Sequence, residues 1–389
     1  MNAFEGAQLL YRSRKLGNFP PPYPNGWWVL AHSGDVKKGE AKPINVLGGQ
    51  YVLWRGQDGI AHFFDAYCPH LGANMAMGGE VHNNCLKCPF HGWEFDGSGA
   101  CTSIPYCDTP NVHAKAEVYK IVEQNQIIYY WYDAEKREPW WEPPYFPEID
   151  SSYTFHGRTE HHVLAHIQEL PENGADVPHL NAVHSQVRMA LTHSWEASWS
   201  ALSEDHSKEK GKTIPKRAQI VKGKGTGING STTPLEGDLS HWTEIKLKES
   251  VAFLGMPLRF LDVHVYINQI GPGIVWLRFH TPIGQALVLG AATPFAPMVQ
   301  RTYHMIFASG TIPRWIAKMM VTTLGKFYEQ DVMIWQWKTF PSKPALVKED
   351  APIRRYRHWF SQFYSEHSTT FDEAVQTYSK GNAALPLDW

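Results

Sequence analysis

Two short stretches of this 389-residue chain, Cys68-Pro-His70 and Cys88-Pro-Phe-His91, each carry one cysteine and one histidine. Seventeen residues separate the two stretches. Each stretch offers one thiolate and one imidazole, so the pair offers two sulfur and two nitrogen ligands. Pro69, Pro89 and Gly92 flank these ligands and favour tight, fixed turns. The two stretches therefore predict a metal centre held by two loops.

Two thiolates and two imidazoles are the ligand set of a Rieske [2Fe–2S] centre, in which Cys68 and Cys88 hold one iron and His70 and His91 hold the other. Such a centre passes one electron at a time. Structural zinc is the alternative, because Cys85-x-x-Cys88 is itself a zinc-like pair. We favour the iron–sulfur interpretation, since alternating C-x-H and C-x2-H loops suit zinc poorly.

The region around these loops reads as a small antiparallel β domain. Short β-branched or aromatic runs are punctuated by Gly, Asp and Asn, as is typical of strands and tight turns. A proline- and aromatic-rich stretch then breaks the pattern, because proline cannot continue a strand or a helix. We therefore expect an N-terminal segment 1–26, a Rieske domain 27–134, a linker 135–150 and a second domain 151–389.

The second domain has a mixed pattern. Residues 166–184 look partly helical, and several strands alternate through 241–309. A polar stretch, 203–225, reads as a surface loop. Residues 312–338 read as a long helix opened by Pro313. The fold class is thus α+β: a β-rich iron–sulfur domain, then a domain with a curved antiparallel sheet and a long helix.

Composition narrows the possible partners and compartments. The formal net charge is −2, so a nucleic acid partner is not favoured. All five cysteines lie between Cys68 and Cys107, which indicates a metal centre in a reducing compartment. No stretch reaches about 18 uninterrupted apolar residues, and the N-terminus lacks the apolar core of a signal peptide. We expect an intracellular protein.

A second constellation lies in residues 172–184, which contain His179 and His184. Two histidines with a carboxylate are the ingredients of a 2-His-1-carboxylate iron site, whose open positions can bind O2. Residues five apart on an ideal helix point about 140° away from each other. The two histidines therefore need a break in the helix to share a metal, and Gly174 and Pro178 offer one.

The carboxylate of this site has more than one candidate. Asp331 is our choice, because it lies on an apolar-rich helix where an unpaired charge would be costly without a cation. Glu329 is the competitor, and both are also compatible with an ordinary solvated helix face. Asp176 lies three residues before His179 and can orient that ring instead of binding metal.

The two constellations, in this order, resemble the Rieske non-haem iron oxygenases from about Trp27 to the end of the chain. The resemblance implies a helix-grip catalytic domain, and a ring of three subunits in which electrons cross between neighbours. It implies that Asp176 links an iron ligand to a cluster histidine of the next subunit. The implied cluster ligands are Cys68, His70, Cys88 and His91, and the implied ligands of the mononuclear Fe(II) are His179, His184 and Asp331.

Within that family, residues 68–79, 88–95, 172–179 and 357–364 are most similar to the cholesterol 7-desaturases (the Neverland group). This likeness implies a membrane-associated enzyme of the endoplasmic reticulum that converts cholesterol to 7-dehydrocholesterol. O2 is the co-substrate, and electrons come from NAD(P)H through a ferredoxin-type or flavin reductase. Animal members usually carry a membrane-spanning segment before the Rieske domain, and this chain shows none.

Two alternatives stay open at this point. A Rieske steroid hydroxylase, similar to the 3-ketosteroid 9α-hydroxylases, would use the same ligands as a monooxygenase. Nothing in a ligand set separates desaturation from hydroxylation, because the outcome depends on how the substrate C–H bonds lie against the iron. An electron carrier or a structural zinc protein without chemistry of its own belongs to another class, and the His179/His184 pair argues against it.

Overall fold

The computed structural model describes residues 17–109, 111, 113–184, 191–202, 239–253, 256–257 and 263–381. The polar stretch 203–225, expected to be a surface loop, lies outside the described residues. Contacts divide the chain into a smaller unit, Trp28–Trp131, and a larger unit made of the residues on either side of it. Each unit is described by itself.

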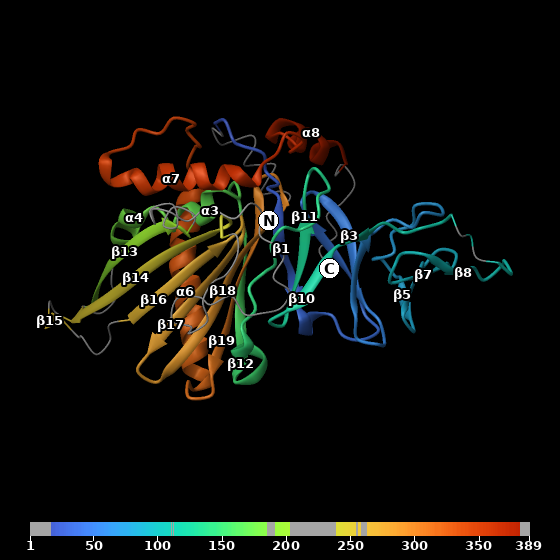
Figure 1. The fold of residues 1–389 in the computed structure, drawn as a ribbon, viewed down its shortest axis with the longest axis horizontal. Helices are drawn as coiled ribbons and strands as arrows, with labels where there is room; N and C mark the ends of the chain where they lie inside the picture. Colours follow the sequence, from blue (N-terminus) through green and yellow to red (C-terminus); the bar gives the residue numbers. More distant parts are fainter. Residues whose placement is uncertain are drawn as a thin grey trace, which may run out of the picture. The chain divides into compact units, whose positions relative to one another are not determined.

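The smaller unit is built from three small sheets (Figure 1). Buried aromatic and β-branched side chains such as Trp54 and Phe64 pack in one cluster with Cys68 and Cys88. The metal-loop cysteines are thus part of the core, which fixes the loops to the strands. In spatial order, the sheets are β1 (Gly26–His32), β11 (Ile127–Tyr132) and β10 (Ile121–Gln124); β2 (Ala41–Val46), β3 (Gly49–Arg55), β4 (Ala61–Asp65) and β9 (Val118–Tyr119); and β5 (Glu80–His82), β6 (Cys85–Lys87), β7 (Glu94–Asp96) and β8 (Cys101–Ser103).

The larger unit contains an eight-stranded antiparallel sheet with the long helix α6 (Arg314–Trp335) along one face (Figure 1). The expected fold class is confirmed, and α6 begins directly after Pro313. The strand order is β12 (Tyr153–Val163), β19 (Val299–Ser309), β18 (Gly284–Ala296), β17 (Ile274–Thr281), β16 (Val263–Ile270), β14 (Trp242–Phe253) and β13 (Leu191–Ala201), with β15 (Met256–Pro257) on β14. The other helices are α2 (Pro147–Ser151), α3 (Glu169–Glu172), α4 (Val177–Val183), α7 (Ala351–Phe360) and α8 (Phe371–Gly381).

Helix α6 packs closely on the sheet. Ala317 and Val321, one helical turn apart, pack against Val288 of β18 and Ile306 of β19. A Cβ added at Gly325 would come within 3.1 Å of the Thr159 side chain on β12. The absent side chain lets α6 approach β12, and this fixes the position of the residues that follow on the helix.

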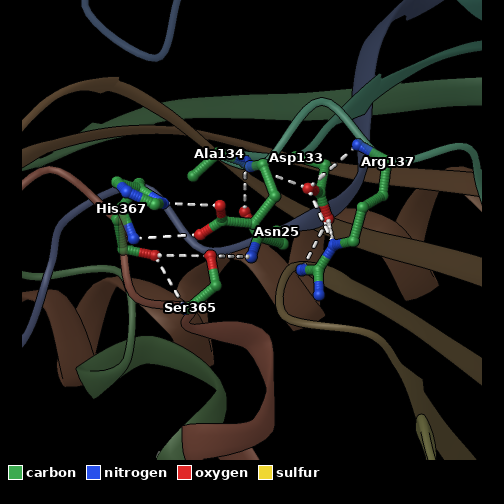
Figure 2. A network of polar contacts seen from close by, with 8 residues as sticks. Asn25, Asp133, Ala134, Arg137, Ser365 and His367 are labelled. Atoms are coloured by element: carbon green, nitrogen blue, oxygen red, sulfur yellow. Dashed lines mark hydrogen bonds and ion pairs between the residues drawn. The ribbon is translucent and has the colours of Figure 1, made fainter.

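Polar contacts tie three distant stretches of the larger unit together (Figure 2). Asn25 accepts a hydrogen bond from the Ala134 N–H at 2.8 Å and donates to the Ser365 Oγ at 3.1 Å. Glu135 binds the Nδ1 atom of His367 at 2.6 Å. Residues from the expected N-terminal segment and from the start of the expected linker are therefore held by the C-terminal part of the chain.

Candidate functional site

The two Cys/His loops adopt the same turn. The first follows β4 and precedes β5, and the second joins β6 to β7. The Gly72 N–H donates to the Cys68 carbonyl at 2.9 Å, and the Gly92 N–H donates to the Cys88 carbonyl at 3.1 Å. Both glycines have positive φ, +73° and +70°, a conformation that glycine adopts without steric cost. Two equivalent loops thus present equivalent pairs of ligands.

The four side chains fit an iron–sulfur cluster. Cys68 and Cys88 are buried and their thiols are in contact, and burial raises the pKa of the Cys68 thiol to about 11. The His70 and His91 rings are half-buried, with centroids 4.7 Å apart. Two inner sulfurs and two outer nitrogens match the Cys-held and His-held irons of a Rieske centre.

Trp93 supports this pair of loops, and sequence reasoning missed it. Its ring stacks on His70, with centroids 4.4 Å apart, and its Nε1 donates to the Tyr106 hydroxyl at 2.7 Å. A tryptophan two residues after a candidate ligand was the only signal available in the sequence. Trp93 and Tyr106 together restrain the His70 imidazole.

A second cluster lies in the larger unit. One ligand atom from each of His179, His184 and Asp331 lies within 4.8 Å of the other two. His184 and Asp331 are buried, and the His184 Nε2 lies 3.3 Å from the Asp331 Oδ1. Among the residues that the structure describes, this is the only such group around a single point. Imidazole, imidazole and carboxylate are the donors that a non-haem Fe(II) site uses.

The expected break at Gly174 is present, because residues 173–176 separate α3 from α4, but it precedes both histidines. Pro178 lies in the first turn of α4, where proline is tolerated. The helix ends at Val183 and leaves His184 as its C-terminal cap. The His184 N–H still donates to the Leu180 carbonyl at 3.1 Å, so the last turn of the helix holds this residue. Its ring centroid lies 5.5 Å from that of His179.

Both rings have a partner for the nitrogen that faces away from the cluster. The His179 Nδ1 contacts the main-chain oxygen of Asp176, and the His184 Nδ1 lies 2.8 Å from the Gln330 Oε1. A proton on each Nδ1 satisfies these acceptors and leaves each Nε2 as a metal ligand. The main-chain oxygen of Asp176 thus orients His179. Gln330 was not predicted, because a side-chain amide in a helix carries no signal of this role.

Burial and hydrogen bonds shift the pKa values of groups in and beside this cluster. Burial lowers the pKa of His184, but hydrogen bonds to Asp331 and Gln330 outweigh it, and the pKa is raised overall. Burial raises the pKa of the Asp176 carboxyl. Glu329, the competing third ligand, is 62% exposed, and its carboxylate lies 3.3 Å from the His161 Nε2 instead. The structure therefore brings Asp331, and not Glu329, to the two histidines.

A cavity of about 850 Å³ borders this cluster. Pockets that enclose a drug-sized ligand span roughly 300–1,000 Å³. The wall of the cavity is formed by β14, β16, β17 and α6 and is mainly apolar. Its apolar residues include Leu247, Val265, Leu277, Phe279 and Leu324. A large, mostly apolar molecule therefore has room to lie against the three ligands.

Family models match both units. A Rieske [2Fe–2S] domain model matches residues 26–121, and a 3-ketosteroid 9α-hydroxylase C-terminal domain model matches residues 130–364. The pair defines a Rieske-type oxygenase, an oxidoreductase with a [2Fe–2S] cluster and a non-haem iron. The match sets the structural zinc interpretation aside.

Proteins of similar sequence show which family of Rieske-type oxygenases the chain belongs to. Cholesterol 7-desaturase from Bombyx mori is 38% identical over 97% of this chain and 76% of its own length. The oxygenase component of 3-ketosteroid-9-alpha-monooxygenase from Rhodococcus rhodochrous is 26% identical over 93% of this chain and 89% of its own length. The chain belongs to the cholesterol 7-desaturase family.

Solved structures agree on the fold. Dicamba monooxygenase bound to dicamba superposes with a TM-score of 0.60 at 17% identity, covering 87% of this chain and 97% of that one. The likeness concerns the fold alone. None of the helices described here is long and apolar enough to cross a membrane.

Proposed function

We propose that this protein is a sterol desaturase that converts cholesterol to 7-dehydrocholesterol by removing hydrogens from C7 and C8. The observation that carries the proposal is the large apolar cavity that borders His179, His184 and Asp331. A sterol needs such a cavity, because its burial is driven by apolar area and its polar groups are few. The Bombyx mori relative bears the name of this activity.

In this proposal, Cys68, His70, Cys88 and His91 hold the cluster, and His179, His184 and Asp331 hold the Fe(II). The bound iron supplies the one-electron and O2 chemistry that side chains lack. The reaction balances when O2 accepts two electrons and two protons from the substrate, two electrons and one proton from NAD(P)H, and one further proton from solvent, and leaves as two molecules of water. The apolar walls exclude bulk water and fix C7 and C8 beside the ligands, while Gln330 and the Asp176 carbonyl hold the imidazoles.

The finer parts of the proposal concern assembly. We expect domains at 27–134 and 151–389 joined by residues 135–150, a homotrimer, and a separate ferredoxin-type or flavin reductase. The half-buried Asp176 carboxylate is expected to link His179 to a cluster histidine of the next subunit. Asp176→Ala keeps the main-chain oxygen that contacts His179. Both metals should therefore remain, while substrate and O2 no longer oxidise the reduced cluster in a single-turnover measurement.

Association with the endoplasmic reticulum membrane is a further proposal, motivated by the apolar substrate. Fractionation of cells that express the chain tests it. Recovery away from that membrane in every condition would contradict it.

Product analysis tests the reaction itself. The holoenzyme is supplied with a reductase, NAD(P)H, O2 and cholesterol, and sterols are separated by mass spectrometry. The expected product is two hydrogens lighter than cholesterol and has the ultraviolet spectrum of a conjugated diene. Cholesterol recovered unchanged, with 3-ketosteroids also inert, would defeat the proposal.

A steroid hydroxylase is the second candidate. The C-terminal family model, which matches residues 130–364, and the Rhodococcus rhodochrous relative favour it. A product one oxygen heavier than the supplied steroid would select hydroxylation.

A further inference from the structure

The cavity opens to the surface at the end opposite the metal cluster. Ile283, in the turn between β17 and β18, and Met319, in the first half of α6, both line the cavity. They are also 44% and 54% exposed. Ala286 at the start of β18 pairs with Ala308 at the end of β19. The turn that precedes β18 and the helix that follows β19 therefore begin at the same end of the sheet. We call Ile283, Trp315 and Met319 the mouth patch.

The exposed side of α6 beside this opening is apolar and cationic. Trp315 is 67% exposed, and Arg314, Lys318 and Lys326 are exposed along the same helix. The sequence has no Asp or Glu from residue 310 to 328, or from 280 to 286. Packing on the sheet accounts for the apolar side chains on one face of α6, but not for the exposed ones. The other face combines tryptophan, methionine and cations, as surfaces that lie on a lipid interface do.

The geometry of α6 gives the distance between the mouth patch and the candidate metal cluster. Met319 and Asp331 are twelve residues apart on α6, and a rise of about 1.5 Å per residue separates them by about 18 Å along the axis. An elongated apolar molecule lying along α6 with one part at the cluster thus points its other end at the mouth. Such a molecule is sparingly soluble in water and partitions into lipid.

We propose that the mouth patch docks on an anionic lipid bilayer, so that the substrate enters the cavity directly from the membrane. The identity of the substrate rests on the proposed function, whereas docking does not. Trp315 and Met319 enter the interfacial region, and Arg314, Lys318 and Lys326 face the anionic headgroups.

The test is co-sedimentation of the holoenzyme with phosphatidylcholine vesicles, with and without phosphatidylserine. Trp315→Glu is compared with Trp337→Glu, because Trp337 is 71% exposed but lies beyond the C-terminal end of α6, outside the mouth patch. Wild type and Trp337→Glu should bind the anionic vesicles equally, and Trp315→Glu should need about tenfold more lipid. Lys318→Glu, a second exposed position, should weaken binding in the same direction, and added salt should weaken binding by the wild type.

Three outcomes would overturn the proposal. They are no binding of wild type to either vesicle, equal binding by Trp315→Glu and Trp337→Glu, or a change of oligomeric state in Trp315→Glu that shows the patch to be an interface between copies. Measurements of cholesterol turnover distinguish a failure of the docking proposal from a failure of the proposed desaturase function. Cholesterol delivered by cyclodextrin should be consumed equally by wild type and Trp315→Glu, whereas cholesterol in vesicles should be consumed more slowly by the variant. Absence of all turnover counts against the function alone, because vesicle binding is measured without it.

Discussion

His184 lies at the end of α4 and Asp331 on α6, and the fold brings their donor atoms to 3.3 Å. His184→Ala removes one of three candidate iron ligands and leaves the smaller unit untouched. We expect turnover to fall by at least about 100-fold, with the visible and EPR spectra of the Rieske cluster unchanged. Glu329→Ala is the matched control, because Glu329 is exposed and outside the cluster. Retained activity in His184→Ala would end the two-site interpretation.

Gln330 gives a second prediction at the scale of single residues. Its Oε1 lies 2.8 Å from the His184 Nδ1 and so holds the tautomer in which Nε2 can bind metal. Gln330→Leu removes the acceptor, and we expect Fe(II) affinity to fall by about 10–100-fold. Gln330→Glu keeps an oxygen at this position and should restore most of the affinity. Equal Fe(II) binding in all three proteins, measured by calorimetry, would show that Gln330 does not orient the ring.

The candidate ligand residues could be chosen from sequence because chemistry restricts their types and spacing. Cys68, His70, Cys88 and His91 form a pattern that few other functions use. Gln330 and Trp93 could not be predicted, because an amide or an indole acquires such a role only when the fold brings it to a histidine. The distinction between the side chain and the main-chain oxygen of Asp176 is also invisible in sequence, since both belong to one residue.

At the scale of elements, the position of α6 on the sheet decides where Asp331 lies. Gly325 faces Thr159, and an added Cβ would meet it at 3.1 Å. Gly325→Leu should lower stability by about 1–3 kcal/mol through overpacking, partly offset by the better helix propensity of leucine. It should also weaken Fe(II) binding, because α6 must move away from β12. Gly310→Leu is the control, since an added Cβ there meets nothing within 4 Å. Equal melting temperatures for the two variants would contradict this prediction.

The strands and α6 could be predicted because their hydrophobic periodicity is strong and Pro313 marks the start of the helix. The shape of residues 172–184 could not. The break at Gly174 precedes both histidines, Pro178 lies inside the first turn of α4, and the helix is capped by His184. Local sequence shows where a helix can end, whereas packing against α6 and β13 decides where it does.

At the scale of the whole molecule, buried neutral histidines make stability depend on pH. The His166 Nε2 donates to the Pro20 carbonyl at 3.0 Å, and its Nδ1 accepts from the Gln168 N–H at 3.2 Å. Burial lowers the pKa of His166 from 6.5 to about 3. The unfolded chain therefore binds the proton first, so stability falls as the pH drops below about 6.5, by about 1.4 kcal/mol per pH unit. Above that pH this histidine has no effect.

Urea unfolding at about pH 7 and about pH 5.5 measures this dependence. His166→Gln keeps a donor and an acceptor but does not titrate. The wild type should lose about 1 kcal/mol more than the variant between the two pH values. Parallel losses would assign the acid sensitivity to other groups, among them the buried His241 and His304, whose pKa values are also lowered to about 3 by burial.

The two candidate metal sites lie in different units of the chain, which raises the question of which cluster would supply electrons to which iron. If electrons cross between neighbours in a ring of three, a subunit with a defective cluster can still receive electrons from another subunit. His91→Ala and His184→Ala should each be inactive alone, because one lacks a cluster ligand and the other an iron ligand. Co-expressed at equal levels, they should recover about one quarter of wild-type turnover, the chance that a given interface joins an intact cluster to an intact iron site. Transfer within one subunit predicts no recovery, so turnover of the purified mixed protein, set against a mixture of the two proteins expressed separately, decides between the two routes.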